Sequence, residues 1–276
     1  MQGIEELAHA KVNLFLRVLR RRKDGFHEIE TLMAPITLCD SIEVESANAF
    51  EFHCDEIGLA GDDNLVVRAA RLFFSETNRA PKVRLTLRKE IPHGAGLGGG
   101  SSDAAAALRG LNRFFDAGLS SEKLRTLGAQ LGSDVSFFVN ETAATCGGRG
   151  EIVKPAFLRE PLSLLLLKPE FGVPSSWAYS FWQATGEAKG EIYQSQKFGD
   201  ITFVNNLERP VFEKFVFLAQ LKSWLLQQQE VGAALMSGSG STIFAVLRPK
   251  VDAESVAARA RDQLDRELWS CVCQTL

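Results

Sequence analysis

The feature that most constrains this chain is a cluster of glycines that leads into a helix. Five of the seven residues from 94 to 100 are glycine, and an alanine-rich helical segment, Ala104 to Phe115, follows. Glycine adopts backbone conformations closed to other residues, and its lack of a Cβ lets a ligand approach the amides closely. Ser101 or Ser102 is suited to cap the helix. Such a turn presents N–H groups and the positive end of a helix dipole, so we predict a phosphate loop whose ligand is a nucleotide.

Three other interpretations of the glycine cluster fit less well. A Walker-type loop requires Lys-Ser or Lys-Thr after its last glycine, whereas Ser101-Ser102-Asp103 stands here. A dinucleotide-binding turn, which residues 94–99 match loosely, should follow the first strand of a βαβ unit and lead to an acidic strand tip, and none is evident. A flexible linker would not be expected to contain Pro92 and Leu97 or to stop sharply at two serines. The phosphate loop is therefore favoured.

The composition is that of an ordinary globular protein. Of 276 residues, 45% are hydrophobic and 24% are charged, and the net charge is −3. That charge gives no support to a nucleic-acid or anionic-membrane partner. The sequence shows neither a signal-peptide pattern nor a segment long enough to cross a bilayer, and its five cysteines lack metal-site spacing. We expect a cytoplasmic protein with reduced thiols and with no nucleic-acid or membrane partner; its oligomeric state stays open.

The first residues alternate between polar and apolar side chains. Residues 8–19 read as a half-buried strand, on which Lys11 and Asn13 share a face. Four basic residues, 20–23, then meet Asp24-Gly25, a strong hairpin-turn signal. The basic run is interpreted as a solvated hairpin tip, with positive potential beside a phosphorylated substrate as the alternative. Phe26 and His27 begin the returning strand.

The remaining periodicity predicts a mixture of helices and strands. Helices are expected near residues 64–74, 121–131, 210–229 and 251–268, strands near 26–33, 41–45, 50–53, 83–88, 162–168 and 269–274, and a variable loop at 183–200. Two further strands should flank the Gly/Ser turn at residues 237–241. Asp134, between Gly132-Ser133 and an apolar run, either caps a helix or serves as a general base in a desolvated pocket. The sequence alone leaves both interpretations open.

Three separated segments together resemble the GHMP kinases, the family of galactokinase, homoserine kinase, mevalonate kinase and phosphomevalonate kinase. They are the strand Ala10-Lys11-Val12-Asn13-Leu14, the loop from Pro92 to Ser102, and the turn from Met236 to Ser241. Their order along the chain matches that of the family. The resemblance implies an α+β fold of two lobes with the active site in the cleft between them. Residues 1–157 would form the ATP-binding lobe, and residues 158–276 would supply the third motif and part of the substrate wall.

Within the family, the segments around residues 24–27, 132–138 and 173–179 are similar to those of kinases with a cytidine-diphosphate acceptor. The resemblance implies transfer of the ATP γ-phosphoryl to the 2-hydroxyl of 4-(cytidine 5′-diphospho)-2-C-methyl-D-erythritol, in isoprenoid precursor synthesis. The chain departs from that pattern in having Ser136 where proline is usual and Phe26 where tyrosine is common. Two alternatives are a kinase of this family with a mevalonate-like or homoserine-like acceptor, and a non-catalytic nucleotide-binding module.

The resemblance also implies a role for each matched residue, with ATP as co-substrate and Mg²⁺ as cofactor. Asp134 would be the base and Lys11 its partner, a pairing of types suited to phosphoryl transfer. No metal ligand is assigned. The residues expected at the substrate are Asn13, Phe26, His27, Ser175 and Tyr179. The residues expected at ATP are Pro92, His93, Gly94, Ala95, Gly96, Leu97, Gly98, Gly99, Gly100, Ser101, Ser102, Asn64, Lys89, Ser237, Gly238, Ser239 and Gly240.

Overall fold

The computed structural model describes residues 3–182 and 190–276. Their contacts divide the chain into two compact units, neither of which is continuous in sequence. The first unit contains the residues up to Ala10 together with Leu38–Pro92 and Gly98–Thr142, and the second contains Lys11–Thr37, His93–Leu97 and Ala143–Leu276. Two long strands, β1 (Ile4–Arg21) and β2 (His27–Ser46), contribute residues to both. The expected lobe boundary at residue 157 stays a prediction.

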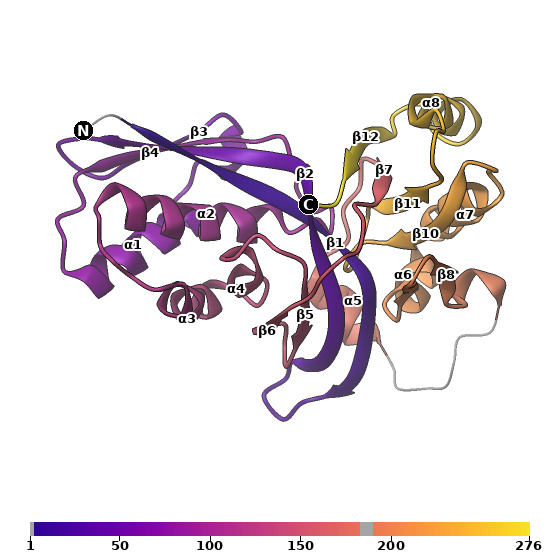
Figure 1. Cartoon of the computed structure of the whole chain (residues 1–276), viewed down its shortest axis with the longest axis horizontal. Coiled ribbons are helices and arrows are strands. Elements are labelled where there is room, and N and C mark those ends of the chain that lie inside the picture. The colour runs from indigo at the N-terminus through magenta and orange to yellow at the C-terminus, as the bar shows by residue number, and fades with distance from the viewer. Residues whose placement is uncertain (1–2, 183–189) are drawn as a thin grey trace. The chain divides into compact units, whose positions relative to one another are not determined.

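The first unit is a layer of helices on one face of a sheet. In this unit β2 pairs antiparallel with β4, and β3 pairs parallel with β4. Figure 1 shows α1, α2 and α3 on the same side of these strands. The elements are β3 (Glu51–Cys54), the 3-10 helix η1 (Ile57–Leu59), α1 (Leu65–Thr77), β4 (Val83–Arg88), α2 (Gly99–Phe114), α3 (Ser121–Leu131) and α4 (Val135–Phe138).

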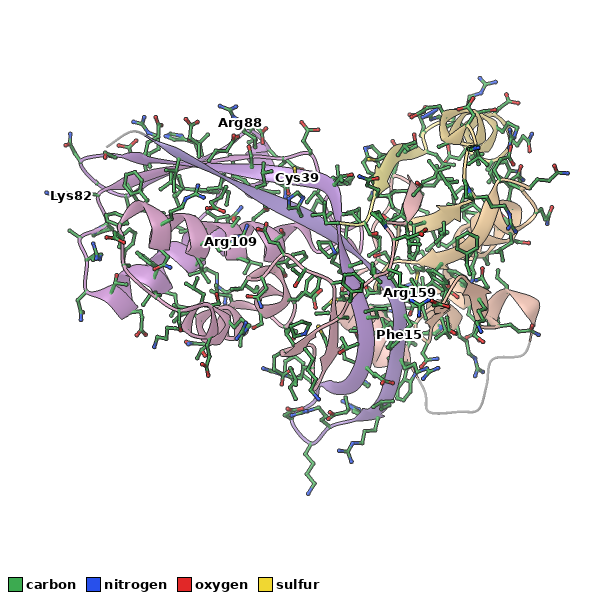
Figure 2. All side chains as sticks on the ribbon, in the orientation of Figure 1. Phe15, Cys39, Lys82, Arg88, Arg109 and Arg159 are labelled. Atoms are coloured by element: carbon green, nitrogen blue, oxygen red, sulfur yellow. The ribbon has the colours of Figure 1, made fainter. Side chains whose placement is uncertain are left out.

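Helix α2 packs tightly in the first unit because its buried face consists of small residues. The four alanines 104–107 are completely buried. At Gly110 a Cβ would lie 3.1 Å from the side chains of both Val44 and Glu6, so the helix approaches the sheet too closely for a larger residue. Arg109 extends from α2 to the start of β1, where it donates to Leu7 O at 2.7 Å (Figure 2). The helix that follows the glycine loop is thus fixed along its length.

The second unit builds its core between a four-stranded antiparallel sheet and helices. The sheet has the order β10-β11-β7-β12, and side chains such as Leu165, Leu167 and Met236 meet Leu221 and Leu225 of α7 in one apolar cluster. In the same unit β1 pairs parallel with β9, and β2 pairs antiparallel with β5. The elements are β5 (Ala144–Gly147), β6 (Ile152–Pro155), β7 (Ser163–Lys168), α5 (Ser175–Phe181), η2 (Glu191–Tyr193), β8 (Gln196–Phe198), β9 (Ile201–Asn205), α6 (Glu208–Lys214), α7 (Val216–Leu226), β10 (Val231–Met236), β11 (Ile243–Leu247), α8 (Ala253–Gln263) and β12 (Trp269–Gln274).

The structure confirms the α+β class and most of the predicted elements, with differences in three places. The helix expected at 251–268 ends at Gln263. The strands expected at 26–33 and 41–45 form one strand, β2, which continues through Pro35. Proline has no backbone N–H to donate, but the carbonyl of Pro35 still accepts a hydrogen bond from Leu276 N. In the expected loop at 183–200, residues 196–198 form β8, while residues 183–189 lie outside the described residues. Among the described residues no helix is long and apolar enough to span a membrane, and all five cysteines, each of them described, are free thiols.

An ion pair lies in the interior of the second unit. Lys222 Nζ lies 2.6 Å from Glu208 Oε2 and also donates to Ile192 O. Glu208 Oε1 accepts from Met236 N, so the carboxylate is bonded at both oxygens. Burial raises the pKa of Glu208, an effect that Lys222 opposes. A charge so deeply buried is tolerated only while its partner remains.

Replacing Lys222 by methionine should therefore lower the free energy of unfolding by about 3–5 kcal/mol, because Glu208 is left buried and unpaired. The double variant Lys222→Met/Glu208→Gln should recover much of that loss, since the buried charge is gone. Urea denaturation measures both. As a control, Arg159→Met breaks the exposed Arg159–Asp200 pair (Figure 2) and should change stability by less than about 1 kcal/mol. A double variant as unstable as Lys222→Met would contradict this account.

Candidate functional site

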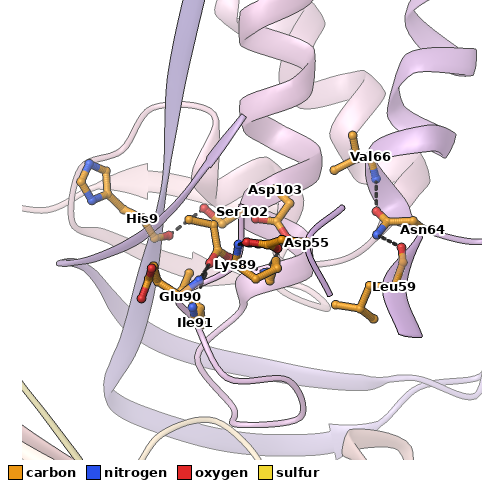
Figure 3. Close-up of polar contacts among 11 residues, drawn as sticks. His9, Asp55, Leu59, Asn64, Val66, Lys89, Glu90, Ile91, Ser102 and Asp103 are labelled. Carbon is orange, nitrogen blue, oxygen red and sulfur yellow. Dashed lines mark hydrogen bonds and ion pairs between the residues drawn. The ribbon is translucent and has the colours of Figure 1, made fainter. Parts of the chain in front are cut away.

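Three glycines of the glycine loop have a left-handed backbone conformation. Gly94, Gly96 and Gly98 have φ of 64°, 75° and 75°, in the left-handed region that glycine tolerates best. Helix α2 begins at Gly99, and among the described residues no side chain caps it. The prediction that Ser101 or Ser102 caps this helix is therefore wrong. The left-handed Gly98 starts the helix early, so both serines lie inside it, and Ser102 Oγ donates to His9 O at 2.7 Å (Figure 3).

The three motifs identified in the sequence meet in the second unit. Lys11 N donates to Leu97 O at 2.9 Å, which joins β1 to the glycine loop. Ser237 Oγ donates to Gly96 O at 3.0 Å, which joins the loop to the Gly/Ser turn. A Cβ at Gly96 would lie 2.2 Å from Ser237 O, and one at Gly238 would lie 3.1 Å from Gly96 O. The two turns approach so closely that only glycine fits at residue 96, while a side chain at residue 238 would be crowded and, at φ of 56°, strained.

Lys11 is buried at this meeting point. Its Nζ donates to Asn13 Oδ1 at 2.5 Å, which confirms that the two side chains share a face of β1. Asn13 donates in turn to Thr31 Oγ1 at 2.8 Å, and Thr31 donates to Phe15 O. Lys11 and Asn13 are 3% and 4% exposed, and a Cβ at Gly238 would lie 3.1 Å from the ammonium nitrogen. The fixed positive charge therefore lies directly beside the backbone of the third motif.

Residues that the sequence analysis did not single out hold the Gly/Ser turn in place. Asn205 Nδ2 donates to Met236 O at 2.8 Å and to Gly238 O at 2.7 Å. Ser239 Oγ lies 2.8 Å from Ser175 Oγ, so the structure brings the third motif to a predicted substrate residue. The Asn205 contacts cross more than thirty positions, and no local pattern indicates them. An asparagine at the end of a strand is the only signal that the sequence offers.

An aromatic group surrounds His27 in the second unit. The His27 and Tyr179 rings stack with centroids 5.5 Å apart, and Trp182 meets His27 edge-on at 5.6 Å. The structure thus brings two predicted residues together and adds Trp182, which the sequence analysis did not identify. The ring of Phe26, by contrast, faces Arg149, whose Cζ lies 4.7 Å from its centroid. Burial and, to a smaller extent, Arg21 lower the pKa of His27.

In the first unit, the Lys89 ammonium lies between the carboxylates of Asp40 and Asp103. Its Nζ pairs with Asp40 and lies 2.7 Å from Asp103 Oδ2, and Figure 3 shows Lys89 beside Asp103. Burial opposes the charge of Lys89, but Asp103 and Asp40 outweigh it and raise its pKa. Burial also raises the pKa of Asp103 to about 8, against the attraction of Lys89. Asp103 Oδ1 is buried and has no hydrogen-bond partner among the described residues.

Two other predicted residues have clear structural positions. Asn64 is the N-cap of α1: its Oδ1 accepts from Val66 N at 2.8 Å, and its Nδ2 donates to Leu59 O at 2.7 Å (Figure 3). Its expected contact with ATP stays a prediction. Asp134 occupies the N-cap position of α4, but its side chain makes no capping bond to the described residues of that helix. The capping interpretation of Asp134 is therefore wrong, and its role as a base stays a prediction.

The raised pKa of Asp103 predicts how stability depends on pH. The folded state holds this proton up to pH about 8, whereas the unfolded chain releases it near the ordinary value of 3.8. Stability contributed by the proton is thus lost as the pH rises through that window, by at most about 1.4 kcal/mol per pH unit. Asp103→Asn should become more stable relative to the parent between pH 5 and 8, as measured by urea denaturation. A stability difference that stays constant over this range would contradict the prediction.

Comparison with known proteins bears on what these motifs do. Residues 64–148 match the GHMP kinases N terminal domain, and residues 184–266 match the GHMP kinases C terminal domain. A 4-diphosphocytidyl-2-C-methyl-D-erythritol kinase of Methylacidiphilum infernorum is 43% identical over 247 residues, which cover 88% of this chain and 86% of the relative. The protein of that name in Thermodesulfovibrio yellowstonii is 36% identical over 284 residues, covering 98% and 96%.

Solved structures agree with the sequence comparison. The crystal structure of a 4-(cytidine 5′-diphospho)-2C-methyl-D-erythritol kinase has a TM-score of 0.79 at 33% identity and covers 99% of both chains. The mevalonate kinase of Methanococcus jannaschii has a TM-score of 0.70 at 12% identity, covering 100% of this chain and 98% of that one, which shows a shared fold alone. With both domains matched and near-full-length relatives above 30% identity, the chain belongs to the GHMP kinase family.

Proposed function

We propose that this enzyme transfers the γ-phosphoryl group of ATP to the 2-hydroxyl of 4-(cytidine 5′-diphospho)-2-C-methyl-D-erythritol, which yields the 2-phosphate and ADP for isoprenoid synthesis. The observation that carries the proposal is the convergence of β1, the glycine loop and the Gly/Ser turn around Lys11. The near-full-length relatives named for this kinase support the choice of acceptor. A cytoplasmic location remains an expectation from the sequence.

The chemistry asks for positioning and for stabilisation of charge more than for covalent help. In this proposal Asp134 accepts the proton of the acceptor hydroxyl as it attacks the γ-phosphorus. The buried Lys11 ammonium, held by Asn13, offsets charge that develops on the transferring group. A cation fixed in a buried site acts strongly because little solvent has to reorganise around it.

The glycine loop would bind the phosphates of ATP through its backbone. Residues 92–102 place three left-handed glycines and the uncapped start of α2 together, and the Gly/Ser turn of residues 237–240 adds further backbone groups beside Lys11. Helix N–H groups without an intrahelical acceptor, and the helix dipole, both favour an anion. Lys89 and Asn64 are proposed to lie near the nucleotide.

Mg²⁺ enters the proposal only as the ion that ATP carries, where it would neutralise phosphate charge. Among the described residues no group of three or more His, Cys, Asp or Glu side chains is arranged to hold a metal. Asp103, the carboxylate nearest in sequence to the loop, directs one oxygen to Lys89. In kinase-type sites Mg²⁺ keeps several waters and binds substrate phosphates together with one or two carboxylates. We assign no residue of this chain to the ion.

The aromatic group around His27 would recognise the cytosine. Because the pKa of His27 is lowered, its imidazole is neutral near pH 7 and offers one donor and one acceptor to a base edge. Tyr179 and Phe26 supply faces for stacking, with Asn13 and Ser175 as further contacts of the acceptor. A site built to hydrogen-bond one base rejects another strongly, since the wrong base leaves polar groups unpaired.

The proposal predicts ADP release that depends on one acceptor. With ATP and Mg²⁺ present, the cytidine compound should be turned over, whereas its uridine analogue, mevalonate and homoserine should not. Asp134→Asn should lower kcat by about 10²–10⁴-fold, the typical contribution of a general base. Asp262→Asn, an exposed change on α8, serves as the control and should keep full activity.

Other outcomes of that assay would replace the proposal. Turnover of mevalonate or homoserine alone would make the chain a different small-molecule kinase of the family and leave His27 without a base to read. ATP binding with no turnover of any acceptor would favour a nucleotide-binding module. Full activity in Asp134→Asn would remove this residue from the mechanism.

The contact between Gly238 and Lys11 gives a second prediction. In Gly238→Ala the new Cβ would lie 3.1 Å from both Lys11 Nζ and Gly96 O, and the displaced ammonium should lower kcat on the order of 100-fold. Gly199→Ala is a matched control, because Gly199 has φ of 58° against 56° at Gly238 but open space around it. Steady-state kinetics of both variants test the difference. Equal activity in the two would show that the close contact does not matter.

A further inference from the structure

The residues that precede the glycine loop are held by a buried carboxylate. Asp40, on β2, is 1% exposed. Its Oδ1 accepts from Glu90 N at 2.6 Å and from Ile91 N at 2.8 Å, the two amides just before Pro92. Hydrogen bonds to an ionised acceptor are among the stronger ones in proteins. Asp40 thereby sets where the backbone enters the loop.

The other oxygen of Asp40 reaches the far end of the loop through Lys89. Lys89 Nζ pairs with Asp40 Oδ2 and with Asp103, the fifth residue of α2 (Figure 3). The three side chains Asp40, Lys89 and Asp103, here termed the Asp40 cluster, lie in one unit and are 7% exposed or less. One ammonium therefore connects the segment before the loop to the helix after it.

In the second unit the middle of the loop is joined to β1 and to the Gly/Ser turn through Leu97 O and Gly96 O, and the Asp40 cluster adds a separate restraint at the two ends of the loop. Between Pro92 and Gly99 every second residue is glycine, and glycine has more conformational freedom to lose than any other residue. A loop that is disordered before it binds a ligand loses affinity, because binding must supply the ordering cost. Fixing both ends of the loop reduces that cost before the nucleotide arrives.

We propose that Asp40 is a positioning residue for the nucleotide, which acts through the Glu90 and Ile91 amides and through Lys89 and Asp103 to preorganise the glycine loop. The ligand class is a nucleoside triphosphate, and its identity as ATP rests on the proposed function. Asp40 contacts no reacting atom in this scheme. Its effect should therefore appear in nucleotide affinity rather than in acceptor binding.

The test is the variant Asp40→Asn, which keeps the shape and one oxygen of the side chain. The N–H donors of the asparagine amide would face the Lys89 ammonium. Residue 40 would then no longer be connected to Asp103 through Lys89. We expect the Kd for ATP, measured by calorimetry without acceptor, to rise by about tenfold or more, as for the loss of one charged hydrogen bond. The KM for the acceptor should stay within twofold of the parent value.

A second readout follows the backbone directly. Amide hydrogen exchange at Glu90 and Ile91 should accelerate in Asp40→Asn, because their acceptor is no longer held in place. Above pH 8, where Asp103 is ionised, Asp103→Asn should weaken ATP binding as well, and the double variant should lose less than the product of the two single effects, since both act through Lys89. That pair of variants keeps the test decisive if one of them folds poorly.

The control is Glu6→Gln, which removes the charge of a β1 residue that pairs with two arginines of the same helix, α2. Glu6 lies 3.4 Å from Arg109 and 2.9 Å from Arg113, further along α2 than Asp103. It should lower stability without changing ATP affinity. If Asp40→Asn also lowers stability and leaves the Kd for ATP within twofold, Asp40 is structural only and the inference fails. A parent enzyme that binds ATP but turns over no acceptor would instead refute the proposed function and leave this test intact.

Discussion

The site depends on the close approach of two glycine turns. A Cβ at Gly96 would overlap the backbone of Ser237, and one at Gly238 would press against Gly96, and each turn brings its backbone to Lys11 through a different contact. The consequence is a buried Lys11 side chain that is bonded to Asn13 and lies beside the backbone of Gly238.

The same arrangement of side chains precedes each of the two turns. In each, a buried acid paired with a buried lysine accepts the amide N–H of a residue just before the turn. Asp40 with Lys89 does so before Pro92, and Glu208 with Lys222 does so at Met236. The Glu90, Ile91 and Met236 amides donate to a carboxylate, and a charged acceptor orients them firmly. The lysine removes the cost of leaving that acceptor charged in the interior.

The sequence was sufficient for the parts of the site that local patterns encode. Alternation placed Lys11 and Asn13 on one face of β1, and glycine spacing identified the loop. It was insufficient where contacts join distant positions: Asp40 meets Glu90 across fifty residues, and Asn205 meets Met236 across thirty-one. The serine cap failed for a different reason. Capping preferences assume that a polar side chain must start a helix, whereas the left-handed Gly98 starts α2 without one.

Strands β1 and β2 each supply residues to both units, and this has a consequence for how the chain can be divided. The second unit contains the hairpin of residues 11–37 near the N-terminus as well as the residues from Ala143 onward. Cutting the chain between β2 and β7 would therefore separate the third motif from the strand that carries its ammonium. A chimera that takes the sequence after such a cut from a relative would combine the Gly96 turn of one protein with the Gly238 turn of another, although the two turns are in close contact. We therefore expect that the two matched family domains cannot be exchanged independently of each other.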